Sequence, residues 1–131
     1  MRIILLLVSF IVAATAWPIA HAGEVDVVDA KARQSGEGVY RFTVSLRHGD
    51  KGWSHYADNW EILAPDGKVL GTRVLLHPHD NEQPFTRSLG GVRIPAGISE
   101  VRVRGRDKVH GHGGKEMRIP LPGRSGKKSG S

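Results

Sequence analysis

Six of the seven histidines in this 131-residue chain occur in three polar segments, and their types and spacing suit a metal ion. The pairs His77-x-His79 and His110-x-His112 could each present two imidazoles from one loop. Neutral imidazole is the commonest protein ligand for transition metals, and a carboxylate can complete such a site. The candidate ligands are His48, His55, His77, His79, His110, His112 and Asp107. Because the chain has no cysteine, we expect a metal held by nitrogen and oxygen, namely copper, zinc or iron.

Each of these short motifs also has a simpler interpretation. A single His-x-His in a polar loop is most often solvated. His48 continues the inward parity of Leu46 and would then cap the core, while His55 would hydrogen-bond locally before a strand. Clustered histidines can also sense pH without a metal. The metal interpretation therefore depends on whether separate segments meet in space.

The first 22 residues have the pattern of an export signal. Arg2 precedes an apolar run over residues 3–14, and Ala20-His21-Ala22 has the small-x-small form of a cleavage site. We expect cleavage after Ala22, which removes the seventh histidine, and a periplasmic or secreted protein. No later stretch is long and apolar enough to be a transmembrane segment.

The rest of the chain divides into a domain over residues 23–121 and a flexible basic tail over residues 122–131, which is rich in glycine and serine. The formal net charge of +6 would suit an anionic surface, but export argues against nucleic acid as the partner. Arg102, Arg104 and Arg106 alternate along one segment. They form either a solvated face that protects a sheet edge or a site for an anion or partner.

Alternating apolar and polar residues predict seven short strands and no helix. The predicted strands cover residues 24–33, 39–47, 58–64, 68–76, 85–94, 98–107 and 115–121. Gly90-Gly91 predicts a kink or bulge in the fifth strand. This pattern predicts an all-β, immunoglobulin- or fibronectin-like antiparallel sandwich of about seven strands, with Trp60 as its buried tryptophan.

Strand direction predicts where the histidines lie. If successive strands alternate in direction, the first, third and fifth connections share one end of the sandwich, and they are short turns without histidine. The second, fourth and sixth connections share the other end, and they hold all six remaining histidines. We therefore expect the imidazoles at one end, the position that antibody domains use for their binding loops.

Two of these segments resemble desulfoferrodoxin-type superoxide reductases, which are immunoglobulin-like iron proteins. The shared features are a loop histidine, then a His-Tyr pair before a strand, and a final hairpin with His-Gly; here these are His48, His55-Tyr56 and His110-Gly111. The resemblance implies His48, His55 and His110 as ligands. It places Asp107 where that family has a cysteine, so superoxide reduction does not follow from it.

We predict from these observations an exported β-sandwich that binds or delivers a transition metal. A second hypothesis is a protein-interaction module for an exported partner, which would use Trp53, Tyr56 and the arginines, with no metal. A small metalloenzyme is the third, and the sequence offers no Ser/His/Asp or paired-carboxylate arrangement in its favour. The oligomeric state is left open.

Overall fold

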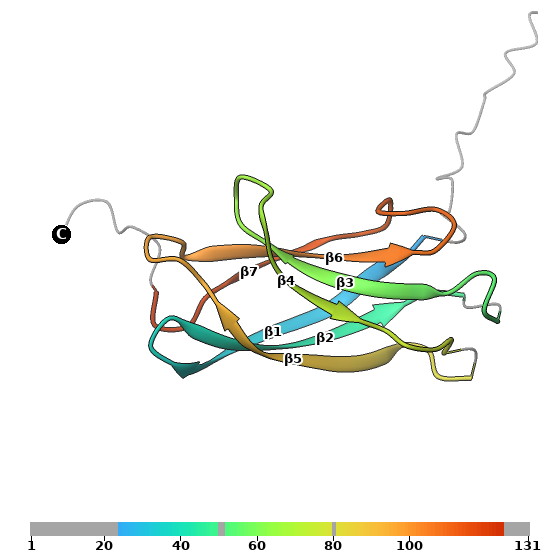
Figure 1. The fold of residues 1–131 in the computed structure, drawn as a ribbon, viewed down its shortest axis with the longest axis horizontal. Coiled ribbons are helices and arrows are strands. Elements are labelled where there is room, and N and C mark those ends of the chain that lie inside the picture. Colours follow the sequence, from blue (N-terminus) through green and yellow to red (C-terminus); the bar gives the residue numbers. More distant parts are fainter. Residues whose placement is uncertain (1–23, 50–51, 80, 125–131) are drawn as a thin grey trace, which may run out of the picture.

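The computed structural model describes residues 24–49, 52–79 and 81–124, and these residues form two packed antiparallel sheets with no helix among them (Figure 1). The strands are β1 (Asp26–Gly36), β2 (Val39–Arg47), β3 (Ala57–Leu63), β4 (Val69–Val74), β5 (Phe85–Arg93), β6 (Glu100–Asp107) and β7 (Met117–Pro120). One sheet has the order β1-β2-β5 and the other β4-β3-β6-β7. The predicted all-β sandwich of seven strands is confirmed.

The core lies between the two sheets, and period-2 alternation explains why. In β2 the side chains of Tyr40, Phe42, Val44 and Leu46 are buried, and the residues between them face outward. Trp60 projects into the same core from β3 and is fully buried, as predicted. Strand β4 pairs with β3 rather than with β5, which distinguishes the fold from the constant-type immunoglobulin order.

The predicted irregularity at Gly90-Gly91 is a β-bulge. Tyr40 pairs with Val92 and Phe42 with Leu89, so Arg41 faces two residues of β5 instead of one. Gly91 has a φ of 67°, a left-handed conformation that glycine adopts without steric cost.

Successive connections lie at opposite ends of the sandwich, as the alternating strand directions predict. The turns β1–β2, β3–β4 and β5–β6 are tight; for example, the Gly67 amide donates to the Ala64 carbonyl at 2.9 Å. The β2–β3, β4–β5 and β6–β7 connections all leave the other end, at the right of Figure 1. All the described histidines occur at or next to these three connections.

The alternating arginines of β6, which are Arg102, Arg104 and Arg106, are paired with acidic residues. Arg104 Nε lies 3.1 Å from Glu61 Oε1 on the neighbouring strand, and Arg102 Nε lies 3.0 Å from Glu116 Oε1. Arg106 contacts Asp58 in the same way, at 2.5 Å. These acids occupy the arginines, so this face gives no support to an anion site on β6.

The predicted signal, residues 1–22, lies outside the described residues, as do residues 125–131 of the predicted tail. Within the described ranges, the chain forms no helix of the length and apolarity that a membrane span requires.

Candidate metal centre

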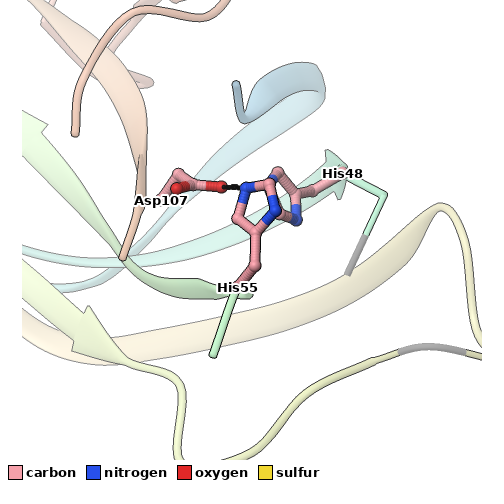
Figure 2. Close-up of side chains that lie close together, drawn as sticks. All are labelled: His48, His55 and Asp107. Atoms are coloured by element: carbon pink, nitrogen blue, oxygen red, sulfur yellow. Dashed lines mark hydrogen bonds and ion pairs between the residues drawn. The ribbon is translucent and has the colours of Figure 1, made fainter. Parts of the chain in front are cut away.

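Three side chains, two from the β2–β3 connection and one from the end of β6, meet at the histidine-bearing end of the sandwich (Figure 2). His48 directly follows β2, His55 precedes β3, and Asp107 is the last residue of β6. One potential ligand atom from each lies within 4.8 Å of the other two. His48 and Asp107 are buried, at 2% and 0% exposure, and the His55 side chain is 20% exposed. The alternation along β2 explains why the His48 side chain is buried, since it continues the inward-facing row that ends at Leu46.

Both imidazoles approach the same oxygen of the aspartate. His55 Nε2 lies 2.6 Å from Asp107 Oδ2, and His48 Nε2 makes a shorter contact with that atom. The His48 and His55 rings are edge-to-face, with centroids 5.0 Å apart. Asp107 Oδ2 is thus the meeting point of two nitrogen donors in a site that excludes most water.

The other carboxylate oxygen is held by the chain itself. Asp107 Oδ1 accepts the backbone N–H of Val109 at 2.6 Å and that of His110 at 2.7 Å. The backbone of Asp107 also exchanges two hydrogen bonds with Gly111, each 3.0 Å long, which closes the tip of the β6–β7 connection. Gly111 permits this closure with a φ of 67°. The orientation of Oδ2 toward the histidines is therefore fixed by local backbone structure.

Burial and hydrogen bonding act on the Asp107 carboxyl in opposite directions. Burial alone raises its pKa, because a low-dielectric surrounding disfavours the charged form. The N–H groups of His110 and Val109, followed by the neighbouring His48, lower it and outweigh burial. The net effect is a pKa below the ordinary value of 3.8, so the carboxylate is ionised at neutral pH.

Further contacts tie the three connections together around the site. The His48 amide donates to Gln83 Oε1 at 2.9 Å, and Gln83 Nε2 donates to the His79 carbonyl at 3.0 Å. The Lys108 amide donates to the Tyr56 carbonyl at 3.0 Å, which joins the β6–β7 connection to the residue after His55. These bonds preorganise the donors before any ion arrives.

The spacing of His55 and Asp107 is compatible with an ion after a small movement. Metal–nitrogen and metal–oxygen bonds of about 2.05 Å in a tetrahedron separate neighbouring ligand atoms by about 3.4 Å. The His55 Nε2–Asp107 Oδ2 distance of 2.6 Å is shorter, so these atoms would move apart by less than about 1 Å. The partly exposed His55 side chain has room to make that movement.

The other four histidines that were predicted as ligands lie outside the group of His48, His55 and Asp107. His110 lies beside the cluster: its Nδ1 is 3.3 Å from Asp107 Oδ1, and its ring centroid is 4.9 Å from that of His55. His112 is directed to Glu61, with Nε2 2.7 Å from Oε1.

His77 and His79 form a separate pair in the β4–β5 connection. Their ring centroids are 4.8 Å apart, and His79 stacks on the buried Phe85 ring at 3.9 Å. Both line an open groove of 670 Å³ that also contains Trp53. Neither belongs to the three-residue group around Asp107.

Sequence reasoning included all three members of the group but not the residues that position them. Gln83 contacts His48 only because two connections that are distant in the sequence lie side by side in the fold. No local sequence pattern indicates this contact. The turn at Asp107 could have been found from the sequence. An aspartate often accepts hydrogen bonds from the backbone amides two and three residues after it.

Comparison with curated proteins gives a significant match. A curated protein from Halomicrobium mukohataei, named "Putative lipoprotein", is 43% identical over 94 residues, which are 72% of this chain and 46% of that protein. The chain therefore spans about half the length of the curated relative that it matches. No protein-family model matches the chain, and no solved structure does. The comparisons thus give no support to the resemblance to desulfoferrodoxin-type superoxide reductases.

Proposed function

We propose that this protein is an exported β-sandwich that binds a transition-metal ion through His48, His55 and Asp107. The observation that carries the proposal is the convergence of two imidazole Nε2 atoms on one oxygen of a buried carboxylate. Export is supported by the signal-like first 22 residues and by the name of the relative, which calls it a lipoprotein.

The charge of the site supports a cation. Asp107 is fully buried, and in the described part of the chain the side chains that form ion pairs with it are those of His48, His55 and His110 rather than lysine or arginine. A carboxylate charge held inside the protein is costly unless it is compensated. A divalent ion between the three donors offsets this cost.

The three donors limit which metals the site could bind. Two imidazoles and a carboxylate leave open positions, an arrangement that proteins use for Fe(II) and that zinc also accepts. Cu(II) fits the same nitrogen and oxygen donors. His110, beside the cluster and 41% exposed, is the further ligand that we propose. The role we assign is metal binding or delivery; superoxide reduction is not part of it, because the comparisons do not support the resemblance that suggested it.

Metal titration of purified protein tests this proposal. We expect one Zn²⁺, Cu²⁺ or Fe²⁺ per chain. In His55→Ala or Asp107→Asn, affinity should fall by about 100-fold or more, since each change removes a direct ligand. His77→Ala is the matched control, because it removes an exposed imidazole outside the group. Equal affinities in wild type, His55→Ala and Asp107→Asn would contradict the proposal.

A second candidate function is supported by Trp53. This side chain is 63% exposed, its ring lies edge-on to Tyr56 at 5.8 Å, and it borders the groove of the β4–β5 connection. Exposed tryptophan is typical of binding hot spots, so the same end could dock a protein partner without a metal. Capture of one partner that survives chelation but is lost in Trp53→Ala would favour this function over metal binding.

A further inference from the structure

The outer face of the β1-β2-β5 sheet has a basic hollow that the proposed metal centre does not use. The hollow has a volume of 410 Å³, and no acidic residue lines it. Its lining residues are Lys31, Ala32, Arg33, Arg41 and Thr43. They come from β1 and β2, toward the β1–β2 turn and away from the connections that carry the histidines.

Two arginines of this hollow lie where their positive charges repel each other. Arg33 and Arg41 are direct cross-strand partners, and like charges in that position destabilise a sheet. In the described part of the chain, neither guanidinium has an ion pair or a hydrogen bond. The arginines of β6 differ, since each of Arg102, Arg104 and Arg106 has an acidic neighbour. An anion between Arg33 and Arg41 would remove the repulsion.

The backbone of β5 makes room for one of these guanidinium groups. A Cβ on Gly90 would come within 2.9 Å of Arg41 Nη1, so the arginine lies closely over the bulge at Gly90-Gly91. Hydroxyl groups continue the polar surface: Thr43 Oγ1 and Ser88 Oγ are 3.0 Å apart across β2 and β5. Lys31 adds a third cation, and its nearest acid, Asp29, lies 3.9 Å away with both side chains exposed. The hollow thus offers cations and hydroxyls, which are the groups that hold oxyanions.

We propose that this hollow binds a phosphate-type oxyanion, held by Arg33 and Arg41 with Lys31 and Thr43 beside them. Guanidinium presents paired N–H donors that match phosphate oxygens, and two guanidinium groups on adjacent strands can both face one phosphate group. The phosphate can come free from solution or as a lipid headgroup, and both sources present the same chemistry.

Titration with two probes tests the site and separates the sources. Inorganic phosphate is added to ¹⁵N-labelled protein while amide shifts of β1 and β2 are followed. Sedimentation with vesicles of phosphatidylglycerol, against phosphatidylcholine vesicles, tests the headgroup. The variants are Arg33→Gln and Arg41→Gln, and the matched control is Arg93→Gln, which removes an exposed arginine of β5 outside the hollow.

We expect saturable shifts at residues 31–33 and 41–43 with phosphate, or sedimentation with phosphatidylglycerol alone if the headgroup is the source. Either response should weaken about tenfold in Arg33→Gln and Arg41→Gln and remain within twofold in Arg93→Gln. Arg33→Gln and Arg41→Gln should also melt no lower than wild type, because each relieves the cross-strand repulsion between Arg33 and Arg41. Absence of both responses, or equal weakening in all three variants, would overturn the proposal.

Discussion

Asp107 determines the chemistry of the histidine-bearing end at the scale of single residues. Its Oδ1 is occupied by two backbone amides, and its Oδ2 receives two imidazoles, so each oxygen has a different role. The amides fix the side chain, and the imidazoles define the place where an ion would bind. The carboxylate therefore serves both the local turn and the proposed metal centre.

Replacing Asp107 by asparagine should weaken the fold as well as the site. The change keeps the shape but removes the charge that strengthens the hydrogen bonds from Val109 and His110, which we expect to cost about 2 kcal/mol. Urea unfolding of the metal-free protein measures this. Asp58→Asn is the control: its partner Arg106 is partly exposed, so its loss should cost under about 1 kcal/mol. Equal losses in the two variants would contradict the assigned role of Asp107.

The stability of the metal-free protein should respond to acid through the same carboxyl group. Its pKa is lowered in the folded state, so its contribution is fully present above the ordinary value of 3.8 and is lost as pH falls below it, through the folded pKa. Urea unfolding at several pH values between 3 and 6 should show wild type losing more stability than Asp107→Asn below about pH 4. Parallel profiles for the two proteins would contradict the lowered pKa.

At the scale of elements, the β6–β7 segment is shaped by close backbone approach. A Cβ on Gly105 would lie 2.3 Å from Val25 Cγ1, and one on Gly114 would lie 1.8 Å from the Val25 carbonyl oxygen. Glycine at these positions lets the segment pass against the beginning of the described chain. Since Gly105 is two residues before Asp107, this packing also sets the position of the carboxylate.

Gly105→Ala should therefore be destabilising. The added methyl group overlaps Val25 in the core, and we expect a loss of about 1–3 kcal/mol, or several degrees in Tm. Gly49→Ala is the control, because a Cβ there meets nothing within 4 Å. Thermal unfolding by circular dichroism compares the two. A Gly105→Ala protein as stable as Gly49→Ala would show that the sheets are less tightly packed at this point.

The elements themselves could be predicted well from the sequence. Period-2 alternation located all seven strands, because each buries one face, and β2 matches its predicted range of 39–47. Most ends of the other strands differ from the prediction, by up to three residues, since pairing partners decide where a ladder stops. The pairing of the β6 arginines with Glu61 and Asp58 was not predictable, because it depends on the register between β3 and β6.

The whole molecule gathers the three histidine-bearing connections at one end because its strands alternate in direction. Strand parity could predict this shared end but not which imidazoles meet, since that depends on side-chain direction. His48, His55 and His110 surround Asp107, whereas His77 packs on His79, and His79 stacks on Phe85.

This division predicts that the β4–β5 histidines are dispensable for the metal. A His77→Ala/His79→Ala double variant should bind Zn²⁺ within about twofold of wild type, although loss of the His79 ring from its stack on Phe85 should lower Tm. Competition with a chromophoric chelator measures the affinity. A loss of affinity matching that of His55→Ala would mean that the two groups share one ion.

The central claim is that one ion binds between His48, His55 and Asp107. Its most direct test is a crystal structure of the metal-loaded protein, with diffraction data collected on both sides of the absorption edge of the metal. We predict one anomalous peak about 2.0–2.2 Å from the Nε2 atoms of both histidines and from Asp107 Oδ2. A crystal in which these three side chains contact each other with no peak between them, while the metal lies at His77 and His79 or nowhere, would contradict the account.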